Sequence, residues 1–230
     1  MSYSFIDYPS INYNERANCA PIDMLIFHYT GMINKECALK KLIDPNAKVS
    51  THYLIDEKGG IYKLVDEANR AWHAGVSYWR RNTDINSRSI GVEIVNPGHE
   101  FGYQEFTDLQ IDAIMKLSRD IISRHPISNR NIVGHSDIAP SRKKDPGELF
   151  DWKCLADQGI GLWPEEAQVL EMNVSTLLSQ LENIGYEINN IKDVVASFQR
   201  HFRPNRVTGR IDPETARKIS GLHQLIENLE

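Results

Sequence analysis

The spacing of apolar residues changes several times along the 230-residue chain, and each spacing predicts a type of element. Nearly continuous apolar and aromatic runs bounded by turn residues predict buried strands within residues 22–31, 88–98 and 131–135. Residues 50–65 are predicted to form two strands joined by a turn at Lys58-Gly59-Gly60.

Helical spacing is clearest at residues 106–125, where Thr107 and Gln110 have the spacing of a capping box. The apolar stripe of this helix consists of Ile111, Ile114, Met115, Ile121 and Ile122. A shorter helix is predicted at 34–44, because Pro45 cannot continue it. Strands and helices alternate up to about residue 155, which predicts an α/β fold with a mixed central β-sheet flanked by helices.

After Pro164 the pattern is helical and no convincing strand is present. The predicted helices lie at 165–186, 190–202 and 212–229. We therefore predict two domains, 1–164 and 165–230, the second a small three-helix domain. Such a short unit has a limited core, so we expect it to pack against the first domain.

Composition narrows the class of protein. Hydrophobic residues make up 41% and charged residues 25%, as in an ordinary soluble globular protein. The net charge of −5 leaves no basic excess for binding nucleic acid. No apolar run has transmembrane length, and we expect no signal peptide at the N-terminus. The chain has three cysteines without CxxC spacing, Cys19, Cys37 and Cys154, so it predicts neither a zinc ribbon nor a disulfide framework. The sequence leaves undecided whether two of them form a disulfide.

Two polar residues interrupt the predicted strands. His28 shares a strand face with Ile26 and Thr30 and lies near the carboxyl end, where open sheets place ligands. Glu93 stands within an otherwise apolar strand, where burying a lone carboxylate is costly. Taken singly, each has an ordinary explanation: a buried histidine with satisfied hydrogen bonds, and a glutamate on an edge or solvent-facing strand.

The stretch VGHSDIAPSRKKDPG places His135, Lys143 and Asp145 close together in sequence. Pro140 prevents a continuous helix, so we expect a loop between His135 and Asp145. A solvated basic loop is one explanation. The other is half of a metal site, because two histidines and one carboxylate are the ligands of a catalytic zinc with a fourth position open for water.

His28 would supply the second histidine of that site. Glu93 is then the candidate general base, and Lys143 the candidate cation that stabilises an oxyanion.

The chain also resembles a known family through several short motifs in a fixed order. These motifs are FHYT, STHYLID, AWHAGVSYWR, SIGVEI and VGHSDIAPSRKKDPG. Together they resemble the zinc-dependent N-acetylmuramoyl-L-alanine amidases of the amidase-2 type, most of all the AmiD enzymes. AmpD enzymes, lysozymes of the phage T7 type and peptidoglycan recognition proteins are more distant. The resemblance covers the chain roughly from His28 to its end.

The resemblance implies hydrolysis of the amide between the lactyl group of N-acetylmuramic acid and L-alanine of the peptidoglycan stem peptide, in cell-wall turnover or recycling. It implies one Zn²⁺ ion as cofactor, held by His28, His135 and Asp145. It assigns the general-base role to Glu93 and the oxyanion role to Lys143, as the residues themselves suggested.

Expectations for the substrate contacts are less specific. In the family the AWHAG segment lies beside the cleft, so Trp72 and His73 are expected to contact peptidoglycan or a muropeptide, together with Trp79 and Arg80. A packed Trp72 and a structural His73 are the alternative. His52 is expected to give structural support. The histidines expected at the surface are His99, His125, His201 and His223.

The C-terminal part resembles the three-helix peptidoglycan-binding domain. The matching positions are Phe198-Gln199, Thr208-Gly209, Asp212-Pro213 and Thr215. The same residues also suit core and turn positions, and the two explanations are compatible. Whether this unit binds glycan stays open.

AmiD enzymes typically begin with a lipoprotein leader, and we expect none in the sequence as given. The expected location is the bacterial cell envelope or periplasm if a leader was removed, and otherwise the cytoplasm. A non-catalytic peptidoglycan-recognition protein and a different zinc hydrolase on the same fold are the alternatives. The presence of all three ligand residues with Glu93 and Lys143 favours the amidase.

Overall fold

The structure is a computed structural model that describes residues 4–17, 20–167 and 173–229. Its centre is a six-stranded sheet in the order β1-β5-β4-β7-β3-β8. These strands are β1 (Ile6–Asp7), β3 (Met24–Tyr29), β4 (Tyr53–Ile55), β5 (Ile61–Lys63), β7 (Ser89–Ile94) and β8 (Ile132–Gly134). β4, β7, β3 and β8 run parallel, whereas β5 is antiparallel to β4, so the predicted mixed sheet is confirmed.

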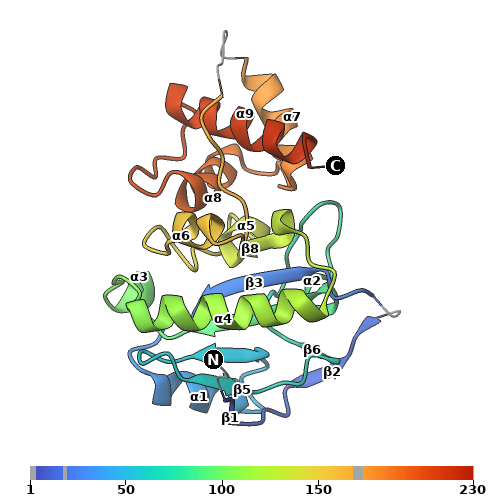
Figure 1. Cartoon of the computed structure of the whole chain (residues 1–230), viewed down its shortest axis with the longest axis vertical. Helices are drawn as coiled ribbons and strands as arrows, with labels where there is room; N and C mark the ends of the chain where they lie inside the picture. The colour runs from blue at the N-terminus through green and yellow to red at the C-terminus, as the bar shows by residue number, and fades with distance from the viewer. Residues whose placement is uncertain (1–3, 18–19, 168–172, 230) are drawn as a thin grey trace.

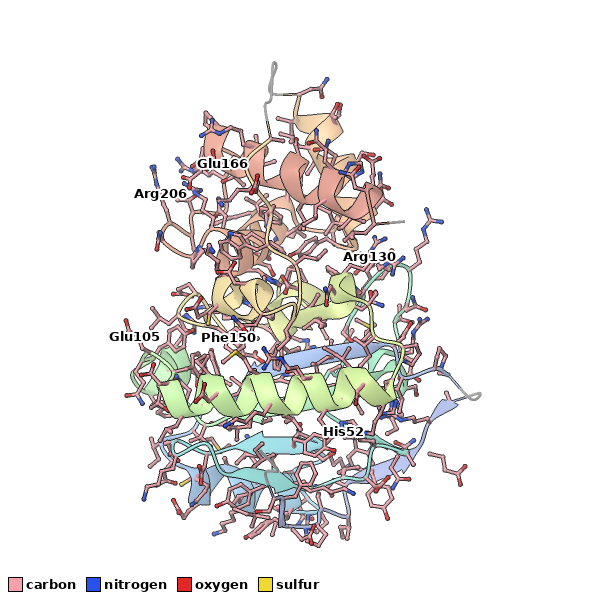
Figure 2. The ribbon with its side chains drawn as sticks, viewed as in Figure 1. His52, Glu105, Arg130, Phe150, Glu166 and Arg206 are labelled. Carbon is pink, nitrogen blue, oxygen red and sulfur yellow. The ribbon has the colours of Figure 1, made fainter. Side chains whose placement is uncertain are left out.

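Helix α4 (Asp108–Arg124) covers one face of the sheet and lies across the front of the view in Figure 1. Alternate strand residues such as Leu25 and Phe27 point toward it, and Ile114 and Leu117 of the helix complete that core. The predicted capping box of Thr107 and Gln110 is present. The aromatic side chain of Phe150 extends the same core by packing against Phe27 beneath α6 (Trp152–Asp157; Figure 2).

The opposite face of the sheet is covered in two parts. Helix α1 (Lys35–Ile43), capped by the Asn34 side chain, packs against Leu54 of β4 through Leu39 and Leu42. Near β3 and β8, residues such as Ile26 and Val133 instead form a core with the C-terminal helices. The sheet face that carries Ile26 and His28 is therefore covered by α1 over β4 and by the C-terminal helices over β3 and β8.

The C-terminal helices are α7 (Val174–Ile184), α8 (Ile191–Phe202) and α9 (Pro213–Glu227), drawn at the upper end of Figure 1. The helix predicted at 165–186 was too long, because residues 164–167 are not helical and Asn173 caps the start of α7. Residues 168–172 of that prediction lie outside the described part of the chain. The expected packing against the first part is present, since Leu181 and Phe198 share a core with Ile26.

Several short elements were not predicted. They are the paired β2 (Tyr13–Glu15) and β6 (Asn69–Ala71), β1, α2 (Ile85–Arg88), α3 (Gly98–Phe101), α5 (His135–Ile138), α6 (Trp152–Asp157) and a 3₁₀ turn at Asn129–Asn131. Most have four residues or fewer, too few for a periodic pattern. Cys37 and Cys154 are free thiols. Among the described residues, every helix is too short or too polar to cross a bilayer.

Candidate metal centre and cleft

The sheet itself brings the first functional side chains together. β3 and β7 are parallel neighbours, and their register pairs His28 with Glu93. β8 lies on the other side of β3, with Gly134 opposite Phe27, and His135 follows directly. Because parallel strands end at one edge of the sheet, all three side chains reach the same region.

The segment after β8 carries the third ligand candidate back to that edge. It begins with the single helical turn α5 and not, as predicted, with a loop alone. Pro140 follows the turn, and the Ser136 N–H then donates to the Asp145 carbonyl at 2.8 Å, which closes the segment on itself. Asp145 thereby lies beside His135 although ten residues separate them.

Three ligand atoms converge at this point. His28 Nδ1 lies 2.9 Å from His135 Nδ1, and both nitrogens lie 3.0 Å from Asp145 Oδ2. All three residues are buried. Tetrahedral zinc bonds to N or O of about 2.0–2.1 Å would separate such atoms by about 3.3 Å, so the cluster has nearly the dimensions of a metal site.

The hydrogen-bond partners show that lone pairs face one another here. His135 Nε2 lies 3.0 Å from the Ala74 carbonyl, which can only accept, so Nε2 carries a proton, and in the neutral ring the lone pair is then on Nδ1. Burial, and then the neighbouring His135, lowers the pKa of His28 to about 4, so this ring is neutral at pH 7.

The Asp145 carboxyl completes this group of acceptors. Burial alone would raise its pKa, but His135 and His28 together hold that pKa well below its ordinary value. An ionised carboxylate and two imidazole nitrogens in mutual contact form a set of electron-pair donors that could hold a metal ion. Two imidazoles and one carboxylate fit Zn²⁺, and they leave one tetrahedral position for water or substrate.

A cavity of about 440 Å³ opens onto the cluster. His135, Asp145, Glu93 and Lys143 line it, so two of the three predicted ligands share one space with both predicted catalytic residues. The other charged or aromatic residues around it are Tyr29, Lys41, Trp72, His73, His99, Glu100, Arg142 and Lys144. Most of these additional residues carry no local sequence signal, because the fold collects them from separate strands, helices and loops.

Glu93 has the electrostatic properties of a proton acceptor. Burial, and then the charge of Asp145, raises its pKa well above the ordinary value, and Lys143 partly offsets this rise. Its Oε2 atom is buried and takes no hydrogen bond from the part of the chain that the structure describes. Lys143 also lowers the pKa of His28, which indicates that its charge lies close to the cluster.

The expected substrate contacts divide into two groups. Trp72 and His73 line the cavity, with Trp72 Nε1 donating to Asn14 Oδ1 at 2.6 Å. Arg80 is not brought to the cavity: its guanidinium donates to Asn131, and its N–H to the Gly185 carbonyl.

The assignment of Arg80 as a substrate contact therefore has no support in this geometry. Trp79 is 3% exposed and packs edge-on against Tyr186, so its expected contact with substrate was wrong.

The burial of the remaining histidines agrees with the sequence-based expectation for some of them and not for others. His52 is buried and accepts from the Gly91 N–H at 2.9 Å, which agrees with structural support. His201 was expected at the surface but is buried between Trp152 and Phe202. Its spacing from Val194 and Phe198, on the apolar stripe of α8, was the sequence signal for burial.

His99 is partly exposed, as the expected surface position requires in part, but it also lines the cavity and contacts Tyr29 Oη at 2.9 Å. His125 and His223 are partly shielded and pair with Glu67 and Glu227 respectively.

A family model described as N-acetylmuramoyl-L-alanine amidase matches residues 18–148, more than half of the chain. This range contains the ligand cluster, Glu93 and Lys143.

The chain belongs to the N-acetylmuramoyl-L-alanine amidase family.

Individual amidases of this family are similar to this chain over most of their own length. AmiD of Escherichia coli K12 is 38% identical over 222 residues, covering 84% of this chain and 79% of AmiD. AmpD of Haemophilus influenzae is 33% identical over 162 residues, covering 63% of this chain and 86% of AmpD.

Solved structures of family members agree with the fold. The complex of E. coli AmiD with anhydro-N-acetylmuramic acid-L-Ala-D-γ-Glu-L-Lys has a TM-score of 0.80 at 36% identity, covering 92% of this chain and 93% of that chain. AmpDH3 from Pseudomonas aeruginosa, in complex with anhydromuramic pentapeptide, has a TM-score of 0.83 at 31% identity, covering 98% and 96%.

Proposed function

We propose that this amidase holds one Zn²⁺ ion with His28, His135 and Asp145 and hydrolyses the bond between the lactyl group of N-acetylmuramic acid and L-alanine. The observation that carries this proposal is the convergence of three buried ligand atoms in the cavity lined by Glu93 and Lys143. When bound, zinc acidifies water and polarises a carbonyl oxygen.

Glu93 is the proposed general base. Its raised pKa, and an Oε2 with no partner among the described residues, suit a group that takes a proton from the attacking water and later delivers it to the leaving amine of L-alanine. The ionised form is needed for the first transfer and the protonated form for the second. A carboxylate whose pKa lies above its ordinary range is the stronger base, so it takes the proton from water more readily, and it remains far more acidic than the ammonium product.

Lys143 is proposed to stabilise the negative charge that develops on the attacked lactyl oxygen. Its side chain lines the cavity, two residues before Asp145. A fixed cation beside a developing oxyanion lowers the barrier because it requires no reorganisation during the reaction. Trp72 is proposed to line the path of the stem peptide.

The proposed substrate is peptidoglycan or a muropeptide released from it. Two relatives were solved in complex with anhydromuramyl peptides, and the cavity here carries the cations Lys41, Arg142 and Lys144 to meet stem-peptide carboxylates. We propose that the chain acts in the cell envelope, where this polymer occurs.

Residues 1–164 and 165–230 are proposed to form the amidase domain and a peptidoglycan-binding-like domain. The motif residues of the latter are internal: Gln199 accepts from the N–H groups of Thr208 and Gly209, and Asp212 caps α9. These contacts explain why the motif specifies the fold of the unit. Because these side chains are engaged inside the domain, any contact with glycan would be made by other residues.

Product analysis tests this function. N-acetylmuramoyl-L-Ala-D-γ-Glu-L-Lys is incubated with zinc-loaded protein, and the products are identified by mass spectrometry. We expect N-acetylmuramic acid and the free tripeptide, with Glu93→Gln releasing far less. Intact substrate would indicate a recognition protein, and a different cleavage product would indicate another amide as the target.

A further inference from the structure

His73 contacts one of the proposed zinc ligands on the side of the ring opposite the metal. Its Nδ1 lies 3.0 Å from His28 Nε2, and the two rings meet edge to face at 83°. Its other nitrogen, Nε2, lies 3.2 Å from the Ser89 hydroxyl. Ser89 in turn donates to the Ile85 carbonyl at 2.7 Å. The four groups form one continuous chain of hydrogen bonds.

The direction of every hydrogen bond in this chain follows from its last member. The Ile85 carbonyl can only accept, so it takes the single proton of the Ser89 hydroxyl. Ser89 Oγ must then accept from His73 Nε2–H, which leaves His73 Nδ1 as an acceptor in the neutral ring. His73 Nδ1 accepts from His28 Nε2–H, so the lone pair of His28 is on Nδ1.

That nitrogen is the atom of His28 that faces His135 and Asp145. The opposite tautomer of His28 would point an N–H at the ligand cluster and could not bind a metal there. The chain of hydrogen bonds therefore selects the tautomer that zinc requires.

Close packing holds the His73 ring in place. A Cβ atom at position 91 would lie 2.5 Å from His73 Cγ and 2.6 Å from Cδ2, so the ring occupies the space that Gly91 leaves on β7. Asn86 Oδ1 accepts from the N–H groups of both His73 and Ala74 and fixes this segment of backbone. The Ala74 carbonyl then binds His135 Nε2. Two adjacent residues thus orient both histidine ligands.

We propose that His73 is a positioning residue that, through Ser89, fixes the tautomer and ring orientation of His28 for zinc binding. This inference rests on the proposed zinc site. It differs from the substrate contact expected from the sequence, because both ring nitrogens are engaged inside the protein and the residue is 8% exposed. Loss of such an outer partner of a metal ligand typically lowers metal affinity about 10–100-fold.

The test compares the zinc affinities of two His73 variants by chelator competition. His73→Leu fills the space beside Gly91 but removes the acceptor for His28 Nε2–H, and we expect zinc to bind about 10–100-fold more weakly. His73→Asn places an amide oxygen near the former Nδ1 and should recover most of the affinity. Trp72→Leu is the matched control, since Trp72 lines the same cavity without a contact to a ligand among the described residues.

A second measurement does not depend on the variants folding. Nitrogen NMR of zinc-loaded wild-type protein with ¹⁵N-labelled histidine identifies the protonated nitrogen of each ring. We expect His73 to carry its proton on Nε2 and to have none on Nδ1. A proton on His73 Nδ1, or equal zinc affinity of His73→Leu and wild type, would overturn the proposal. Absence of zinc binding by the wild type would instead refute the metal site itself.

Discussion

Each proposed zinc ligand depends on a specific neighbour for the position of its ligand atom. His28 is held by His73, His135 by the Ala74 carbonyl, and Asp145 by the Ser136 N–H that closes its loop. The ligand atoms are therefore in place because their other polar atoms are already engaged. This arrangement predicts that catalytic and ligand residues respond differently to substitution.

Lys143→Ala should separate catalysis from metal binding. Removing one stabiliser of an oxyanion typically lowers kcat about 10²–10³-fold, while no zinc ligand is lost. We expect this loss of kcat together with a normal zinc content. Lys144→Ala is the control, because it removes a neighbouring cation from the same cavity and should affect kcat much less. Unchanged turnover in Lys143→Ala would refute the oxyanion role.

The buried histidines predict a dependence of stability on pH in the metal-free protein. Burial lowers the pKa of His28 to about 4 and that of His52 to about 3. In the unfolded chain both take up protons below about pH 6.5, where the folded protein does not. The free energy of unfolding should therefore fall as the pH decreases from about 6.5 toward 4.

Urea denaturation in the presence of a chelator, at several pH values across this window, measures the effect. A midpoint that stays constant or rises on acidification would contradict the assignment of neutral buried histidines.

At the scale of elements, the site is made by neighbouring parallel strands and by the glycine of β7 between them. Gly91 leaves room for the His73 ring, and Glu93 two residues later points into the cavity from the same face. One strand thus provides the packing space for a positioning residue and the proposed general base.

Gly91→Ala tests this use of space. Overpacking at such a contact typically costs about 1–3 kcal/mol, and displacement of the His73 ring should also weaken zinc binding. In a His73→Ala background, Gly91→Ala should lower the free energy of unfolding much less, because the clashing ring is absent. Urea denaturation measures the loss of unfolding free energy in each background. Equal losses in the two backgrounds would show that the contact between position 91 and the His73 ring does not limit packing.

The long strands and helices were predictable because their patterns are local. Alternation in β3 and β7 put His28 and Glu93 on informative faces, and the periodic stripe of α4 identified its buried side. Short elements such as β2 contain too few residues for a pattern and form through distant pairing. The partners of His73 and His201 could not be predicted for a related reason: His28 and Asp137, which they contact, lie far away in the sequence.

At the scale of the whole molecule, a buried polar cluster joins the ligand-bearing turn to the C-terminal helices. Asp137 of α5 accepts from the Gly134 N–H and from the Tyr186 hydroxyl at 2.6 Å, and it pairs with His201 at 2.8 Å. His135 belongs to the same turn. The C-terminal unit therefore holds the turn that carries His135, even though it contributes none of the proposed zinc ligands.

Tyr186→Phe tests this support. The change removes a hydroxyl from a buried carboxylate, which typically costs about 1–3 kcal/mol of stability. Tyr13→Phe, at an exposed position, should change the free energy of unfolding by no more than about 0.5 kcal/mol. Similar urea midpoints for Tyr186→Phe and wild type would mean that Asp137 does not depend on this contact.

The central claim is that zinc held by His28, His135 and Asp145 is required for amide hydrolysis. The most direct measurement is the rate of tripeptide release from muramyl tripeptide before metal removal, after chelation, and after zinc is added back. We predict that chelation abolishes release, and that zinc restores it in the wild type but not in Asp145→Ala. Full activity in the metal-free protein, or restoration of Asp145→Ala by zinc, would contradict the account.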